Sequence, residues 1–224
     1  SSLNEGRLIH FQIIEMNLYP VRELGTALVD MYSKCGNLED AKNVLTKFPV
    51  REVGPWNALI SGYARHGNLD LALQGLKDMQ KDGIKPDVIT WTAIIGGCTE
   101  WGFYDVALDS FKYMQLEDVL PNAVTYVPLL KACGNIEAVN DGRFVHYHAV
   151  QYGYESDINV GTTLVDMYAK CGCLEDAYYA FESLSHQNVV SWGAIIGAYV
   201  EHEQNLRALS LFDKMQESGV VPNR

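Results

Sequence analysis

The sequence repeats itself with a period near 35 residues, and this feature constrains the fold more than any single motif. Residues 28–38 read LVDMYSKCGNL, and residues 164–174, which lie 136 positions further on, read LVDMYAKCGCL. A fixed period of this size is typical of repeat architectures, in which each repeat stacks on its neighbours. We therefore expect function at matching positions of successive repeats instead of in one cleft.

Six complete repeats can be laid end to end in one continuous array. The repeats span 22–52, 53–87, 88–122, 123–157, 158–188 and 189–223. Residues 1–21 match the second half of repeat 123–157, so the chain is expected to start inside a repeat. Below, position 1 is the first residue of each repeat.

Apolar and small residues recur at fixed positions and predict two helices per repeat. Positions 7, 8 and 11 are apolar, with the 3- and 4-residue spacing of one helical face. Position 7, for example, holds Leu28, Leu59, Ile94, Leu129, Leu164 and Ile195. Position 20 is always Ala or Gly, which allows two helices to approach closely. Helix breakers lie between the two segments, as in Arg65-His66-Gly67. The pattern predicts an all-α fold of stacked helical hairpins, with some thirteen helices.

Composition narrows the class of protein further. The chain is 48% hydrophobic, yet no apolar run approaches the roughly 20 residues of a membrane span, so no membrane association is expected. Four of the five cysteines fall at repeated positions, Cys35 with Cys171 and Cys98 with Cys133. This pattern favours structural thiols in a reducing compartment over disulfides.

The repeat motif resembles the pentatricopeptide repeat over the whole chain. Repeat 53–87 carries V-x-x-W-N-A-L-I-S-G-Y-A-R-H-G and ends in G-I-K-P-D. The W-x2-L-G-x2-Y pattern of tetratricopeptide repeats is absent. Repeats 22–52 and 158–188 resemble the family's short type, and repeat 123–157 and residues 1–21 resemble its long type. The other repeats resemble the ordinary 35-residue type. This mixture resembles the plant PLS subclass. The resemblance implies a right-handed α-solenoid superhelix.

The resemblance also implies binding of single-stranded RNA at about one base per repeat, read by position 5 and the last position. Asp accepts hydrogen bonds and suits guanine or uracil, whereas Asn can also donate and suits adenine or cytosine. In the family, Asn at position 5 goes with pyrimidines and Thr with purines. The base-reading residues are therefore predicted to be Asn57 with Asp87 (uracil), Thr92 with Asn122 (adenine) and Thr162 with Asn188 (adenine).

The expected RNA register is U-A-N-A across residues 53–188, from 5′ to 3′. The pairs Thr26/Glu52 and Gly193/Asn223 depart from the common code, and Val127/Asp157 belongs to the long-type repeat. Position 2 is expected to pack against the base face, and position 13 to contact phosphates. The base-packing residues are Ile89, Val124 and Val190, and the phosphate contacts are Lys34, Arg65 and Lys170.

The net charge of −11 favours an alternative, a helical-repeat scaffold for protein–protein interaction, because nucleic-acid binders usually carry a basic surface. Catalysis within the chain is not expected. The H-x-E and C-x-x-C motifs of a zinc cytidine deaminase are absent, and we expect no metal site and no cofactor. His146 and His148 form the only paired-histidine feature, and His10 repeats His146, which favours a structural role.

By resemblance, the chain is expected to mark a site on a plant organellar transcript, in the chloroplast or mitochondrion, for processing by other proteins. C-to-U RNA editing is the process that the PLS-type pattern implies. Long-type repeats of this family also resemble docking sites for small editing cofactor proteins, so repeat 123–157 is a candidate for that role.

Overall fold

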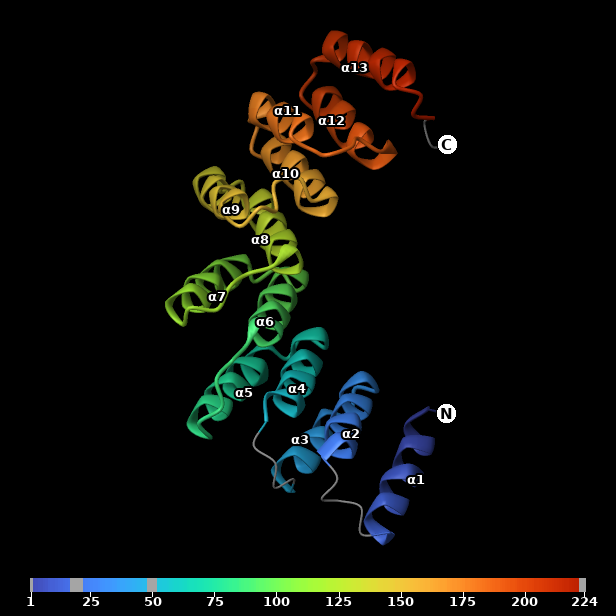
Figure 1. The fold of residues 1–224 in the computed structure, drawn as a ribbon, viewed down its shortest axis with the longest axis vertical. Coiled ribbons are helices and arrows are strands. Elements are labelled where there is room, and N and C mark those ends of the chain that lie inside the picture. Colours follow the sequence, from blue (N-terminus) through green and yellow to red (C-terminus); the bar gives the residue numbers. More distant parts are fainter. Residues whose placement is uncertain (1, 17–21, 48–51, 222–224) are drawn as a thin grey trace. The chain divides into compact units, whose positions relative to one another are not determined.

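The protein is all-helical in the computed structural model, which describes residues 2–16, 22–47 and 52–221 (Figure 1). No strand occurs among these residues. The thirteen helices of this described part are α1 (Ser2–Glu15), α2 (Arg22–Lys34), α3 (Leu38–Lys47), α4 (Val53–Arg65), α5 (Leu69–Lys81), α6 (Val88–Glu100), α7 (Tyr104–Leu116), α8 (Ala123–Asn135), α9 (Val139–Gln151), α10 (Ile158–Lys170), α11 (Leu174–Glu182), α12 (Val189–Glu201) and α13 (Asn205–Glu217). The all-α class is thereby confirmed.

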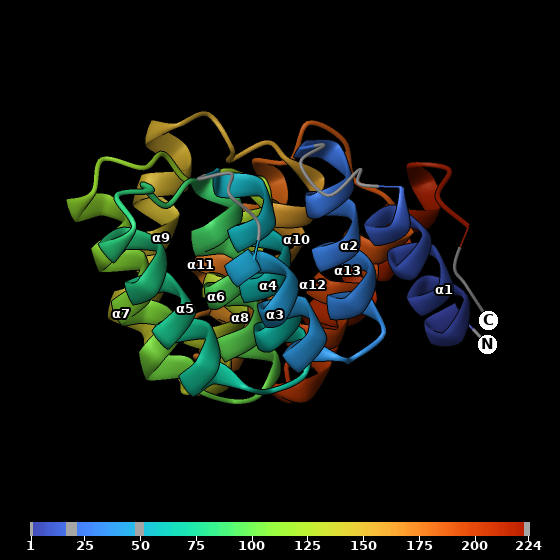
Figure 2. The ribbon, with the colours of Figure 1, turned by 90° about the horizontal axis from the view of Figure 1, so that it is seen from below.

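The chain divides into two compact bodies. The N-terminal body comprises residues 1–101 with 110–120, and the C-terminal body comprises residues 102–109 with 121–224. The division runs through α7, whose first residues belong to the C-terminal body. In the N-terminal body, α2 pairs with α3 and α4 with α5, while α2, α4 and α6 stack on one another. In the C-terminal body, α8 pairs with α9, α10 with α11 and α12 with α13, while α8, α10 and α12 stack. Figure 2 shows the same helices from a second direction.

Each first helix starts where a repeat starts. The helices α2, α4, α6, α8, α10 and α12 begin at Arg22, Val53, Val88, Ala123, Ile158 and Val189. These six residues are also position 1 of the six repeats defined by the sequence. The assignment of the repeats to short, ordinary and long types stays a prediction, as does the handedness of the superhelix. Residues 1–21 provide one described helix, α1.

The recurring apolar positions form the core of each body. Every position-7 and position-11 residue is buried, and so is every small residue at position 20. Position 8 is buried in five repeats, whereas Ile196 in the last first helix is half-buried. The turn between the two helices of a hairpin passes through the left-handed region, for example at Gly67 (φ 74°). Glycine adopts that conformation without steric cost, so the short turn can reverse the chain.

Candidate nucleic-acid interface

The last residue of a repeat is the N-cap of the first helix of the next repeat. Asp87 caps α6, Asn122 caps α8, Asp157 caps α10 and Asn188 caps α12. In each of them, the side-chain oxygen Oδ1 accepts backbone N–H bonds of the first helical turn, at 2.9–3.1 Å. Capping thus fixes the orientation of the predicted base-reading side chains.

Capping leaves the second polar atom of these side chains for another partner. Among the described residues, no hydrogen bond reaches Oδ2 of Asp87, or Nδ2 of Asn122 or Asn188. All three side chains are half-buried. The atom that distinguishes Asp from Asn is therefore the atom that is not engaged in capping, as base reading requires.

The position-5 residue and the last residue of repeat 53–87 are in direct contact. Asn57 Nδ2 on α4 donates a hydrogen bond to Asp87 Oδ1 at 2.9 Å. Asn57 is only 6% exposed, because it lies beneath the start of α6. Thr162 on α10 is half-buried and lies in the same body as Asn188. Thr92 and Asn122 are both half-buried, and they belong to different bodies.

The predicted base-packing residues present apolar surface to solvent. Ile89 is 58% exposed, Val124 66% and Val190 60%, all in the first turn of a first helix. An apolar side chain normally gains from burial, so exposure at the same position of three repeats is consistent with a surface that receives an aromatic ring. Asn223 lies outside the described residues, so the pair Gly193/Asn223 has no structural description here.

The three predicted phosphate contacts lie at the C-terminal ends of first helices and differ in their surroundings. Lys34 Nζ makes an ion pair with Asp30 at 2.7 Å, and Lys170 Nζ makes one with Asp166 at 3.0 Å. Lys170 Nζ also donates to Asn135 Oδ1 at 3.3 Å. Arg65 is exposed and makes no ion pair among the described residues. Arg65 is thus the least neutralised of the three cations.

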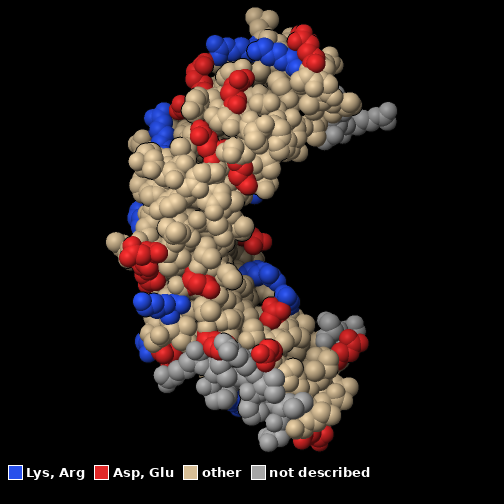
Figure 3. Space-filling view, in the orientation of Figure 1, with Lys and Arg blue, Asp and Glu red and all other residues tan. Residues whose placement is uncertain are grey.

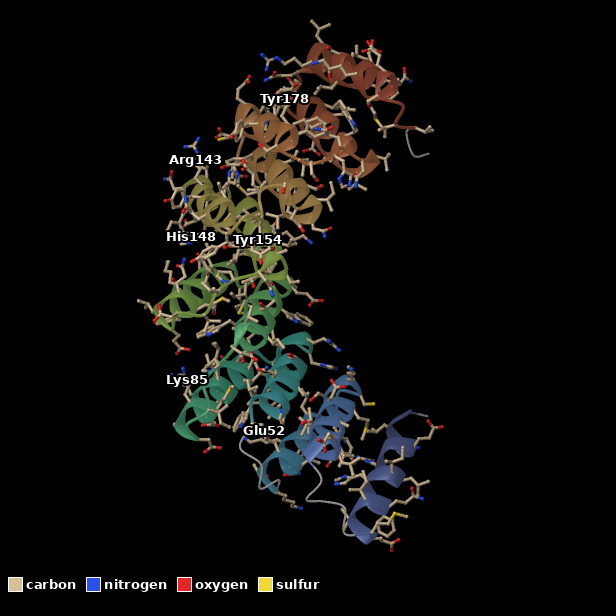
Figure 4. All side chains as sticks on the ribbon, viewed as in Figure 1. Glu52, Lys85, Arg143, His148, Tyr154 and Tyr178 are labelled. Carbon is tan, nitrogen blue, oxygen red and sulfur yellow. The ribbon has the colours of Figure 1, made fainter. Side chains whose placement is uncertain are left out.

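Repeat 22–52, whose pair departs from the common code, has an acidic surface. A hollow of about 450 Å³ is lined by Glu23, Thr26, Ala27, Asp30 and Glu52. Glu52 precedes α4 and makes no capping hydrogen bond with its side chain; it is labelled in Figure 4. Three carboxylates around one hollow oppose the approach of a phosphate.

Two histidines and two cysteines pack within the described part of the chain. His146 Nδ1 lies 2.9 Å from the Tyr168 hydroxyl, and His10 repeats this contact with Tyr32 at 2.9 Å. Burial lowers the pKa of His146, so its ring is neutral at neutral pH. Burial also raises the pKa of the Cys98 thiol to about 11 and that of Cys133 to about 12.

No group of three or more potential metal-ligating residues occurs among the described residues. Nor is any helix of that part long and apolar enough to cross a bilayer.

Two sets of residues in this interface were not identified from the sequence. The first consists of Asp30 and Asp166, which pair with Lys34 and Lys170; their i,i+4 spacing was a visible signal. The second consists of hydroxyl residues at position 3 of the repeat that follows each base-reading pair: Thr90, Thr125 and Ser191. Their signal was the recurring pattern D-x-x-T, N-x-x-T and N-x-x-S, which is a form of the capping box.

Comparison with known families matches most of the chain. The PPR repeat model matches residues 26–51, 162–189 and 190–220, the PPR repeat family model matches 51–100, and the Pentatricopeptide repeat domain model matches 76–136. The chain is built of pentatricopeptide repeats. Together with the helix boundaries above, these matches confirm the family that the repeat motif indicated. The matches do not identify a subclass.

Curated relatives are pentatricopeptide repeat-containing proteins of Arabidopsis thaliana. One chloroplastic protein is 30% identical over 99% of this chain, and another is 35% identical over 96%. The chain spans only 23% and 29% of the length of these two relatives. A third relative, 31% identical over 99% of this chain, is also named chloroplastic. These names agree with the predicted location in a plant organelle.

Solved structures show the same fold. The crystal structure of the pentatricopeptide repeat protein PPR10 from maize aligns with a TM-score of 0.66 and 25% identity, covering 88% of this chain and 30% of that chain. Nuclear proteinaceous RNase P 2 from Arabidopsis thaliana aligns with a TM-score of 0.64 and 16% identity, covering 79% of this chain and 41% of that chain. At 16% identity, the second likeness shows the fold alone.

Proposed function

We propose that this chain binds single-stranded RNA in a sequence-specific manner, with one base per repeat. The observation that carries the proposal is the contact between Asn57 and Asp87, which brings position 5 and the last position of one repeat together. The unengaged atom of each capping residue is a donor in Asn and an acceptor in Asp, which is the property needed to distinguish bases by their edges. The exposed apolar residues at position 2 supply surface for stacking.

The proposed register is U-A-N-A for repeats 53–87 to 158–188, from 5′ to 3′. Asp87 next to Asn57 suits uracil, and Asn122 and Asn188, with Thr92 and Thr162, suit adenine. We propose that the array marks a plant organellar transcript for processing, and that the PLS-type repeat lengths point to C-to-U editing. In this proposal the array supplies recognition, and the chemistry belongs to other proteins.

A groove on the second helices of the C-terminal body favours an additional role in protein docking. It has a volume of about 360 Å³ and lies beside α9, the second helix of repeat 123–157. Exposed Tyr147 and Tyr179 line it together with Arg143, which is labelled in Figure 4 and makes an ion pair with Asp176 at 2.8 Å. Aromatic side chains and arginine are enriched where proteins bind each other. We propose this groove as the place where a small editing cofactor protein docks.

Binding to matched RNAs tests the RNA-binding proposal. An RNA containing U-A-N-A and a second RNA with the same bases in another order are titrated in the presence of random competitor RNA. We expect the first RNA to bind at least about tenfold more tightly, as for one good base-edge contact. Equal binding of the two RNAs would contradict sequence-specific recognition. If no RNA binds at all, the protein-scaffold alternative is favoured.

A further inference from the structure

A fully buried hydroxyl follows each of the three complete base-reading pairs. Thr90, Thr125 and Ser191 all have 0% exposure, and each lies three residues after the last residue of the pair. The hydroxyl is missing where the pair departs from the common pattern. Pro55 occupies that position after Glu52, and Val160 occupies it after Asp157. The hydroxyl therefore accompanies base-reading pairs and not helix starts in general.

The hydroxyl closes a reciprocal pair of hydrogen bonds with the capping residue. The Asp87 backbone N–H donates to Thr90 Oγ1 at 3.1 Å, and the Thr90 backbone N–H donates to Asp87 Oδ1 at 3.0 Å. The same box is formed by Asn122 with Thr125 and by Asn188 with Ser191.

The backbone conformation of the capping residue differs between helices with and without this capping box. The three boxed caps have ψ angles of −176°, 179° and 175°, whereas Asp157, which lacks a box, has a ψ of 128°. The box thus accompanies one backbone conformation of the base-reading residue.

In repeat 53–87 the hydroxyl also orients the position-5 side chain. Thr90 Oγ1 donates to Asn57 Oδ1 at 2.5 Å, while Asn57 Nδ2 donates to Asp87 Oδ1 at 2.9 Å. Because the Thr90 backbone N–H also donates to Asp87 Oδ1, the three residues form a closed triangle of hydrogen bonds. The Asn57 amide accepts a hydrogen bond at its oxygen and donates one from its nitrogen. The Thr90 hydroxyl and the Asp87 carboxylate together therefore fix the orientation of the amide group.

We propose that Thr90 is a positioning residue for base recognition, which holds the side chains of Asn57 and Asp87 in the orientation that reads a base. This inference rests on the proposed RNA-binding function. Asp87 Oδ1 accepts three N–H groups, from Ile89, Thr90 and Asn57, which leaves Oδ2 as the acceptor for a base. Uracil offers a ring N–H to that atom, whereas cytosine offers a ring nitrogen that cannot donate. Thr125 and Ser191 have the same capping-box role at Asn122 and Asn188.

The test of Thr90 compares its variants on RNAs that differ only at the nucleotide facing repeat 53–87. We expect the wild type to prefer uracil over cytosine about ten- to a hundredfold, and Thr90→Val, which keeps the shape but removes the hydroxyl, to reduce the preference to less than about threefold. Thr90→Ser retains the hydroxyl and should retain the preference. The control is Thr99→Val, which removes another buried hydroxyl of α6 that donates to the Ile95 carbonyl and lies away from the cap.

A second readout separates positioning from general destabilisation. The base preference at the nucleotide facing repeat 158–188 should be the same in Thr90→Val and in the wild type. Full retention of the uracil preference by Thr90→Val overturns the inference, and so does an equal loss in Thr99→Val. If the wild-type protein shows no preference between uracil and cytosine, the proposed function itself is contradicted, and the inference about Thr90 is then wrong as well.

Discussion

At the scale of single residues, one side chain caps a helix and is also proposed to read a base. Asn122 Oδ1 accepts hydrogen bonds from the backbone N–H and the hydroxyl of Thr125, each at 3.1 Å. Asp and Asn are about equally good N-cap residues, because both supply this oxygen. They differ at the other atom, which is a donor in Asn and an acceptor in Asp. Under the proposed mode of recognition, an exchange of Asn and Asp at this position would change the base that is read without a change in the fold.

Asn122→Asp is expected to switch the preference of repeat 88–122 from adenine to guanine. Asn can donate to adenine N1, whereas aspartate places a negative charge opposite that acceptor and instead accepts from guanine N1–H. Relative affinity for two RNAs that differ only at this nucleotide should shift by ~1–3 kcal/mol. The measurement is a titration of each RNA with the wild type and the variant.

The control for this prediction is thermal unfolding, which should be nearly the same in the two proteins because the cap is retained. If both proteins rank the two RNAs in the same order and by the same ratio, Asn122 does not read the base and the proposed register is wrong.

At the scale of helices, neighbouring repeats are joined by close approach and by side-chain bonds to helix ends. A Cβ atom at Gly97 of α6 would lie 2.6 Å from Ala64 Cβ and 3.1 Å from the Ala64 backbone of α4. The indole Nε1 of Trp101, just after α6, donates to the Ala64 carbonyl at 3.1 Å. His202 Nε2 lies 2.7 Å from the Ala169 carbonyl at the matching place in the C-terminal body. Trp101 and His202, both at position 14, thus bind a carbonyl at the end of the preceding first helix that also accepts a backbone N–H of the following turn.

Gly97→Ala and Gly96→Ala form a matched pair on α6. Gly97→Ala should destabilise the protein by ~1–3 kcal/mol, because the new methyl group forces α4 and α6 apart. Gly96→Ala should be neutral or stabilising by up to ~1 kcal/mol, because nothing lies within 4 Å of its Cβ and alanine favours the helix. Chemical denaturation of both variants measures the difference. Equal changes in the free energy of unfolding would show that the close contact between α4 and α6 does not determine the cost of the added methyl group.

At the scale of the whole molecule, the net charge of −11 sets the balance between phosphate contacts and base contacts. Acidic and basic side chains are interspersed on the face seen in Figure 3, with large uncharged areas between them. Two of the three predicted phosphate contacts, Lys34 and Lys170, make ion pairs with aspartates. In the proposed RNA complex, few phosphates can therefore be neutralised, and base contacts are expected to supply much of the affinity.

Salt dependence measures the number of phosphate contacts. With the three cations Lys34, Arg65 and Lys170, a plot of log K against log salt should have a slope of about −2, since each contact with a single strand contributes about −0.7. Arg65→Ala should make the slope shallower by about 0.7 and weaken binding to all RNA sequences alike. Lys77→Ala, on the exposed surface of the second helix α5, is the control and should leave the slope unchanged. An unchanged slope in Arg65→Ala would show that this residue does not contact the RNA.

The sequence by itself determined the all-helical class, the hairpin repeats and the residues that form their core. These features follow from local periodicity: apolar residues spaced by three and four positions mark one face of a helix, and the breakers between them mark its ends. The start of α6 at Val88 and the burial of Leu59 and Tyr63 could be predicted in this way. The candidate base-reading positions also came from the repeat period, through the family resemblance.

Only the tertiary structure decided what those side chains contact. Asn57 lies 30 positions before Asp87 and 33 before Thr90, so periodicity within one helix carries no information about their triangle of hydrogen bonds. The same holds for Lys170, which reaches Asn135 of the preceding repeat. Such contacts depend on how one hairpin stacks on the next, and this stacking is set by packing between residues a whole repeat apart. The sequence therefore indicated the positions proposed for recognition, and the packing of α4 against α6 determined which atom of Asp87 stays without a hydrogen bond among the described residues.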